Sequence, residues 1–245
     1  MRRVIVLTAL MAGSLLTARS QRFVHHDYQS FFEWFHQQSQ VNQLYRDHAT
    51  LYVFGHKARV HRAPDRGATV IAELTMGQSV VNIAYGEADP LPTDKVNGYH
   101  DLWYHVRGQD RRGRAFEGYV WGADIARGWR HADITGDGYP EFVLLGLPDR
   151  PRTAPSDIKA ELRVLQNGRL MEQRLVPGLC IFEECGASPM LRILRDPVRS
   201  RLTVIEAMTM TIGCSVGIEK AFYFWNGRRL ERIFHAEFTT EHIFA

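Results

Sequence analysis

Five residues between positions 133 and 141 combine the residue types and the spacing that a hard cation needs. Oxygen-bearing side chains recur at alternate positions, Asp133, Thr135 and Asp137, and a further carboxylate follows at Glu141. Alternate residues of such a turn point inward, a glycine at its sixth position permits the sharp bend, and Tyr139 can add its carbonyl oxygen. The chemistry that this pattern indicates is the binding of one calcium ion.

The segment resembles the calcium loop of integrin-type FG-GAP and related propeller repeats, in which the loop runs into an apolar strand, here Phe142 to Leu145. The resemblance implies that the five residues hold calcium. Thr135 replaces the usual Asp or Asn, and one copy is present where a full propeller has several. Leu144 occupies the position of the bidentate glutamate of an EF-hand, which excludes that family. A metal-free Asp-Gly turn that opens a strand is the alternative.

A second pattern, Gly213-Cys214-Ser215-Val216-Gly217, has the spacing of the nucleophile elbow of serine hydrolases. An elbow needs a strand before the serine and a helix after it. The residues that follow, up to Trp225, are instead typical of a strand that ends at an Asn-Gly turn. We therefore interpret the segment as a Gly-rich turn. The rival hypothesis is a hydrolase that uses Ser215 or a site in the cleft between two β regions.

Three cysteines, Cys180, Cys185 and Cys214, lie together in the last third of the chain. In an oxidising compartment one disulfide could form and leave one thiol over. The turns predicted near these positions fall on one edge of a meander, so Cys214 could pair with Cys180 or Cys185. Three buried thiols are the alternative. Neither CxxC nor HExxH spacing occurs, so a zinc site is not indicated.

The elements that must position these residues are mostly short strands. Residues 27–47 predict one amphipathic helix, with apolar residues at helical spacing after a capping Asp27. From Ala49 onward, β-rich runs alternate with Gly, Pro and Asp, and the stretch from Gly86 to Asp101 predicts a long loop. The predicted strands are 50–54, 58–61, 69–74, 79–85, 102–107, 117–121, 139–147, 160–166, 169–175, 190–194, 202–210, 220–225 and 230–238.

The order of motifs in the first β region resembles a bacterial SH3-type domain. The motifs are VHRAPD at 60–65, VIAEL at 70–74 before a glycine turn, WYHV at 103–106 and GYVW at 118–121. Members of that family commonly act as targeting or binding modules in exported proteins, often towards cell-wall material. The resemblance implies a ligand groove lined by Trp103, Tyr104, Tyr119 and Trp121. Because side chains alternate along strands, about half of these four should face the core.

The first twenty residues predict a signal peptide. A basic start with Arg2 and Arg3 precedes an uncharged, mostly apolar run from Val4 to Leu16, and small residues then allow cleavage before Gln21. This run is too short to cross a hydrocarbon core of about 30 Å, and no later run is long enough. The net charge of +3 disappears with this segment, which leaves 27 basic and 27 acidic side chains. A neutral protein has no overall field that attracts nucleic acid.

These patterns predict a mainly β fold with an N-terminal helix, a small SH3-like β-barrel and an antiparallel β-meander that resembles part of a propeller. The predicted boundaries are a signal peptide over 1–20, a helical segment over 21–48, the barrel over 49–130 and the meander over 131–245. We expect an exported protein, periplasmic or extracellular. Its predicted function is non-catalytic binding or scaffolding in the cell envelope, with a cell-wall polymer or an envelope protein as partner.

Overall fold

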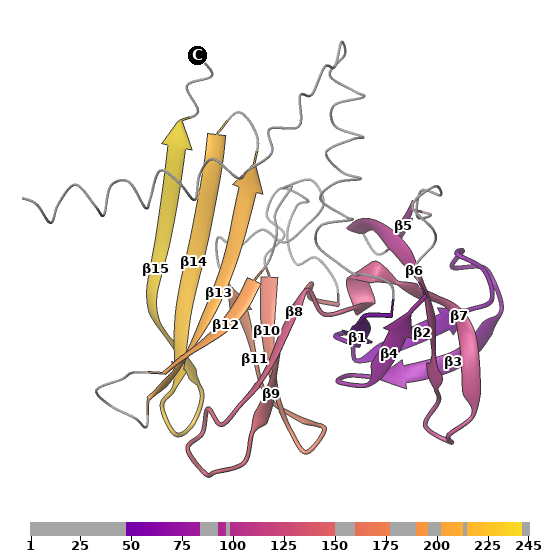
Figure 1. Cartoon of the computed structure of the whole chain (residues 1–245), viewed down its shortest axis with the longest axis horizontal. Coiled ribbons are helices and arrows are strands. Elements are labelled where there is room, and N and C mark those ends of the chain that lie inside the picture. Colours follow the sequence, from indigo (N-terminus) through magenta and orange to yellow (C-terminus); the bar gives the residue numbers. More distant parts are fainter. Residues whose placement is uncertain are drawn as a thin grey trace, which may run out of the picture. The chain divides into compact units, whose positions relative to one another are not determined.

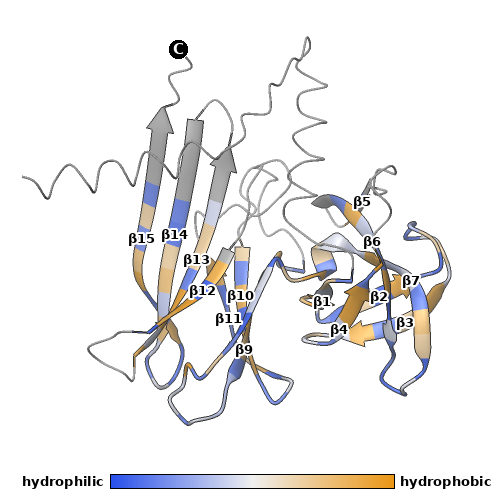
Figure 2. Ribbon diagram, viewed as in Figure 1, coloured by the Kyte–Doolittle hydropathy of each residue, from blue (hydrophilic) through white to orange (hydrophobic). Residues whose placement is uncertain are grey.

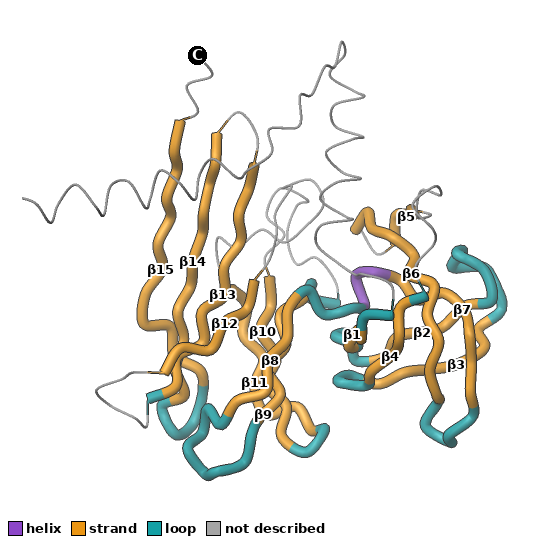
Figure 3. The backbone as a smooth tube through the Cα atoms, in the orientation of Figure 1, coloured by secondary structure: helices purple, strands orange, loops and turns teal. Residues whose placement is uncertain are grey.

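The computed structural model describes residues 48–83, 93–96, 99–149, 160–176, 190–195, 202–212 and 215–241 (Figure 1). The chain divides into two compact units, residues 1–34 and 35–245, and every described residue belongs to the second. The predicted signal peptide, the predicted helix over 27–47 and all three cysteines lie outside the described residues. Within them the fold is mainly β, as predicted, with antiparallel sheets and one short helical turn, Gly122–Asp124 (Figure 3).

The first β region forms one seven-stranded sheet in the order β1-β4-β6-β7-β2-β3, with β5 paired to β6. Residues from six of these strands enclose a single apolar core, which includes Leu51, Val60, Leu74, Val106 and Val120. The predicted small barrel is not confirmed, because no sheet of the described residues is closed and β1 and β3 form open edges. The strands are β1 (Thr50–Tyr52), β2 (Lys57–His61), β3 (Val70–Thr75), β4 (Ser79–Asn82), β5 (Thr93–Val96), β6 (Tyr99–Gln109) and β7 (Ala115–Trp121).

The second β region consists of two four-stranded antiparallel sheets, where the sequence predicted one meander. The first sheet runs β11-β10-β9-β8 and the second β12-β13-β14-β15, so each is a meander by itself. The first contains β8 (Gly128–Ala132), β9 (Glu141–Gly146), β10 (Ala160–Gln166) and β11 (Arg169–Val176). The second contains β12 (Met190–Arg195), β13 (Thr203–Ile212), β14 (Ser215–Trp225) and β15 (Leu230–Glu241).

Burial of β10 explains why this region is layered. All but the last of its residues are buried, so both faces of the strand are covered. On one face Leu162 and Val164 share a core with Ile205 and Ala221 of the second sheet. On the other face Leu165 packs with Phe54, which precedes β2. A strand covered on both faces needs a layer on each side, and a single meander provides only one.

Most predicted strands are present with shifted ends, and three segments differ. Residues Thr93–Val96 form β5 inside the predicted loop, where they pair with Tyr99–Leu102 of β6. Gly128–Ala132 form β8, and β14 begins at Ser215 rather than at Lys220. These segments carry glycine or charged residues and little apolar alternation, so the strand neighbours rather than local propensity hold them extended. Figure 2 shows hydrophobic residues gathered along the strands and hydrophilic residues at most of the turns.

The two Asn-Gly turns behave differently. Asn167 and Gly168 both have positive φ, 50° and 74°, which confirms the predicted type I′ turn between β10 and β11. At the second turn only Gly227 has positive φ, and the Asn226 side chain accepts hydrogen bonds from the backbone N–H groups of Arg228 and Arg229. The predicted type I′ turn is therefore wrong there, because a longer turn closed by the Asn226 carboxamide joins β14 to β15. None of the helices among the described residues is long and apolar enough to span a membrane.

Candidate functional site

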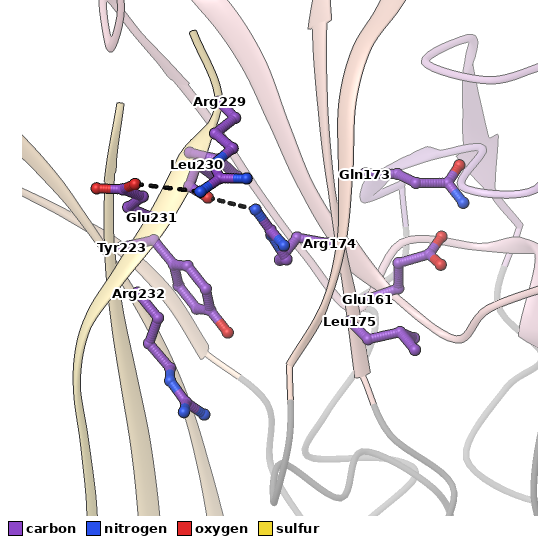
Figure 4. Close-up of a pocket in the computed structure, with 9 residues that line it drawn as sticks. All are labelled: Glu161, Gln173, Arg174, Leu175, Tyr223, Arg229, Leu230, Glu231 and Arg232. Carbon is purple, nitrogen blue, oxygen red and sulfur yellow. Dashed lines mark hydrogen bonds and ion pairs between the residues drawn. The ribbon is translucent and has the colours of Figure 1, made fainter. Parts of the chain in front are cut away.

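A pocket of about 580 Å³ lies between the outer strands of the two four-stranded sheets, within the size range of small-molecule sites. It is lined from β10 and β11 on one side and from β14, β15 and the turn between them on the other (Figure 4). The nine lining residues are Glu161, Gln173, Arg174, Leu175, Tyr223, Arg229, Leu230, Glu231 and Arg232. Three arginines and a single phenol are thus among the lining residues.

A β-bulge decides which side chains reach this pocket. The pairing of β14 with β15 shifts between Phe222 and Tyr223, so Arg232 stands opposite Tyr223 and the extra residue, Ile233, is 52% exposed. Bulges redirect side chains and are frequent beside functional sites. Directly opposed residues share a face of the sheet, so the guanidinium of Arg232 and the phenol of Tyr223 lie on the same side.

Arg174 completes the group from the other sheet. Its Nη2 donates a hydrogen bond of 2.8 Å to the carbonyl of Leu230, which links β11 to β15 (Figure 4). Its Nε lies 3.7 Å from Oε1 of Glu172, a distance too long for a hydrogen bond. In Figure 4 the Tyr223 ring points from β14 into the space that Arg174 enters from β11. The two sheets therefore bring these donors together.

The Tyr223 hydroxyl is buried and has no hydrogen-bond partner among the residues that the structure describes. Burial raises the pKa of Tyr223, while the positive charges of Arg232 and Arg174 act in the opposite sense. The phenol is therefore protonated at neutral pH and can donate a hydrogen bond. An unsatisfied buried hydroxyl costs about 1–3 kcal/mol, so a group that enters the pocket and accepts this hydrogen bond would be favoured.

The charge of the pocket is positive. Glu161 is paired with Arg163 at 2.7 Å, and Glu231 lies 3.5 Å from Arg229, so both acidic lining residues have a basic partner. Arg232 forms no ion pair with any described residue. A neutral phenol beside two guanidinium groups is suited to an anionic group such as a carboxylate or a phosphate. The described lining contains no His, Cys or Ser.

The four aromatic residues of the predicted groove do not form one surface. Trp103 and Tyr104 are each 1% exposed and Trp121 is 5% exposed. Trp103 and Trp121 lie together, with ring centroids 5.4 Å apart, whereas Tyr104 belongs to the core enclosed by the seven-stranded sheet. Only Tyr119 is partly exposed, and its ring stacks on His105 at 4.7 Å. The two tryptophans and Tyr104 therefore offer no accessible surface to a ligand.

The predicted calcium loop connects β8 to β9 and is closed by the chain's own donors. Both carboxylate oxygens of Asp133 accept hydrogen bonds from backbone N–H groups, and the buried Glu141 accepts three from Ile134 and Thr135. Asp137 accepts one from the N–H of Tyr139. No three His, Cys, Asp or Glu side chains in the described part of the chain are grouped to hold a metal ion. The carboxylates of Asp133, Asp137 and Glu141 thus each have a donor from the chain itself.

Ser215, the nucleophile of the rival hypothesis, is the first residue of β14 and pairs with Glu241. A strand follows it, so the strand-turn-helix geometry of a nucleophile elbow is absent at this point. The nearest histidine in the following sequence, His235, pairs with Ala221. The backbone positions of Ser215 and His235 are therefore about 20 Å apart along the ladder.

An ionic cluster lies where the loop after β1 meets β10. The buried guanidinium of Arg163 pairs with Glu161 and, at 3.2 Å, with Asp149, and it donates a hydrogen bond to the carbonyl of Phe54. It also lies 4.2 Å from the centre of the Phe54 ring. Nearby, burial raises the pKa of Asp124 to about 7, with further contributions from the negative charges of Asp149 and Asp101. Since Arg163 is fully paired, this cluster has a structural function.

Sequence reasoning missed the residues that form the pocket, Arg174, Tyr223 and Arg232. They are distant in sequence and follow no motif, and the only local signal is the alternation that places Tyr223 on an inner face. Comparison of the chain with protein-family models, with curated proteins and with solved structures finds no match.

Proposed function

We propose that this protein is an exported, non-catalytic binding module of the cell envelope whose pocket recognises an acidic group of a cell-wall polymer. The observation that carries the proposal is the buried Tyr223 hydroxyl, which lacks a partner in the described structure and lies beside two guanidinium groups. A carboxylate that enters the pocket would accept hydrogen bonds from Tyr223, Arg174 and Arg232. Hydrogen bonds to charged groups are worth about 1.5–3 kcal/mol each, enough for a specific site.

Features of the two β regions support the resemblances on which this proposal draws. Six short strands around one core are compatible with a bacterial SH3-type domain. Two successive four-stranded meanders, each with Asn-Gly between its third and fourth strands, are compatible with blades of a propeller. Modules of the first kind often bind cell-wall material, and we propose the same location here.

Export rests on the first twenty residues. We propose that cleavage before Gln21 releases the mature chain outside the cytoplasm, because a basic start, an apolar run and small residues occur in the order that signal peptidase requires. Mass spectrometry of the protein from its native host should then find Gln21 at the N-terminus. A chain that keeps Met1 and stays in the cell would contradict this part of the proposal.

Binding is tested with the mature chain and insoluble peptidoglycan. We expect N-acetylmuramate, which carries a carboxylate, to compete for retention. Arg232→Gln removes the positive charge and Tyr223→Phe removes the hydroxyl donor, and each should weaken the competitor's affinity by about 10- to 100-fold. Arg228→Gln is the matched control, because Arg228 is an exposed arginine in the turn between β14 and β15 that does not line the pocket. Isothermal titration calorimetry measures the affinities.

Two different results would contradict the pocket and the cell-wall partner separately. Equal binding by the wild type, Arg232→Gln and Tyr223→Phe would show that the pocket is not the site. Absence of retention on peptidoglycan would remove the cell-wall polymer as partner.

Fluorophosphonate labelling tests the rival hydrolase. We expect no labelling, because Ser215 begins strand β14 and is not followed by the helix that a nucleophile elbow needs.

A further inference from the structure

Every carboxylate oxygen of Asp133, Asp137 and Glu141 already accepts a hydrogen bond from the chain. Backbone N–H groups and the Thr135 hydroxyl supply most of these donors. The remaining donor comes from outside the loop. It is the side chain of Gln166, the last residue of β10, next to the Asn167-Gly168 turn.

The carboxamide of Gln166 bridges two carboxylates of the loop. Its Nε2 lies 2.8 Å from Oδ2 of Asp137 and 3.0 Å from Oε1 of Glu141. The NH₂ group has two donors, so it can serve both oxygens at once. A cation in such a loop also lies between carboxylates that would otherwise repel each other. The amide thus makes the bridge that a cation would make, without a positive charge.

We propose that Gln166 replaces the cation in this loop, and that the loop is a calcium-independent connection between β8 and β9. The loop is also anchored to the second sheet, because the hydroxyl of Thr203 in β13 donates a 3.0 Å hydrogen bond to the carbonyl of Asp133. Donors from β10 and β13 therefore hold both ends of the segment. Closure of the loop comes with folding of the sheets and needs no metal.

The substitution Gln166→Glu tests this directly. It places a fourth carboxylate where the amide bridges Asp137 and Glu141, so like charges meet and the melting temperature in EDTA should fall. Calcium supplies the missing positive charge, so millimolar calcium should raise the melting temperature of this variant by about 5–10 °C. The wild-type chain should melt at the same temperature in calcium and in EDTA. Circular dichroism of the mature chain records each transition.

Two further variants separate the amide's contribution from a general effect of charge. Gln166→Met keeps the length of the side chain but removes both donors, and should melt at a lower temperature than the wild type, equally in calcium and EDTA. Gln109→Glu adds a carboxylate at an exposed position of β6 and should show no response to calcium.

Two outcomes would overturn the proposal. A rise of several degrees for the wild type in calcium would show that the loop holds the cation itself. A Gln166→Glu variant that responds to calcium no more than Gln109→Glu does would show that Gln166 does not occupy the cation's place. If Gln166→Glu is unfolded in EDTA, folding on addition of calcium supports the proposal, and failure to fold in both media counts against it.

Discussion

Tyr223 has a buried hydroxyl without a hydrogen-bond partner among the described residues. The unpaired hydroxyl lowers the stability of the unliganded protein. Such a cost persists at binding sites because the ligand removes it. At the residue scale, removal of the Tyr223 hydroxyl should raise the stability of the free protein and lower its affinity for the ligand.

We predict that Tyr223→Phe stabilises the unliganded protein by about 1 kcal/mol, since it removes the unpaired hydroxyl and keeps the ring. Urea unfolding of the mature chain measures this change. Tyr139→Phe is the control, because Tyr139 is 73% exposed and the loss of its hydroxyl should change little. A clear loss of stability in Tyr223→Phe would mean that the hydroxyl has a partner in the free protein.

At the scale of elements, the short helical turn Gly122–Asp124 joins β7 to the chain that leads into β8. The carbonyl of Asp124 accepts hydrogen bonds from the N–H groups of Phe54 and Gly55, at 2.7 and 3.2 Å. A Cβ on Gly55 would lie 2.9 Å from the Asp124 carboxylate, so the backbone covers that carboxyl group closely. The turn thus places an acid with a pKa of about 7 in a position from which water is largely displaced.

The raised pKa of Asp124 makes stability depend on pH. Between about pH 4 and pH 7 the folded state keeps a proton that the unfolded state releases, so this contribution to stability falls as pH rises and is lost above pH 7. Asp124→Asn cannot ionise, so its free energy of unfolding should exceed that of the wild type at pH 8 by up to roughly 4 kcal/mol. The difference should shrink towards pH 4. Urea unfolding at several pH values measures it.

Asp110 provides a control of opposite sign. The backbone and the guanidinium of Arg114 donate hydrogen bonds to its carboxylate and lower its pKa. Asp110→Asn should therefore lose stability at neutral pH, and the loss should vanish in acid as pH falls through the folded pKa. If the difference in free energy of unfolding between Asp124→Asn and the wild type does not change with pH, the pKa of Asp124 is not raised in the folded state.

At the scale of the whole described structure, Phe54 links the seven-stranded sheet to the first four-stranded sheet. Its ring is fully buried against Gly146 of β9 and the guanidinium of Arg163, and it packs on Leu144 and Leu165. A Cβ on Gly146 would lie 2.4–2.6 Å from three atoms of this ring. Glycine is therefore required at 146 by the close approach of a side chain.

We predict that Gly146→Ala lowers the free energy of unfolding by about 1–3 kcal/mol, because the Phe54 ring must move and lose contacts with its neighbours. Thermal unfolding should shift downward accordingly. Gly67→Ala, at an exposed turn where the added Cβ would lie 3.4 Å from Asp65, should change stability much less. Equal stability of the two variants would show that Phe54 does not join the sheets.

Much of the β structure follows from local sequence. Alternation of apolar residues predicts most strands because side chains of a strand point to opposite faces, and the Asn167-Gly168 turn follows from the positive φ that these residues tolerate. The division into two sheets could not be read in this way. It depends on burial of both faces of β10, which is a property of the layers around the strand.

The residues of the pocket belong to the part that only the tertiary structure decides. Arg174 comes from one sheet and Tyr223 and Arg232 from the other, and a one-residue bulge brings the last two onto the same face. Gln166 meets Glu141 across 25 positions of sequence. Local spacing predicts which atoms are available for chemistry, such as the carboxylates of the β8–β9 loop. Which donors reach them depends on long-range strand pairing, because pairing sets the register of every side chain.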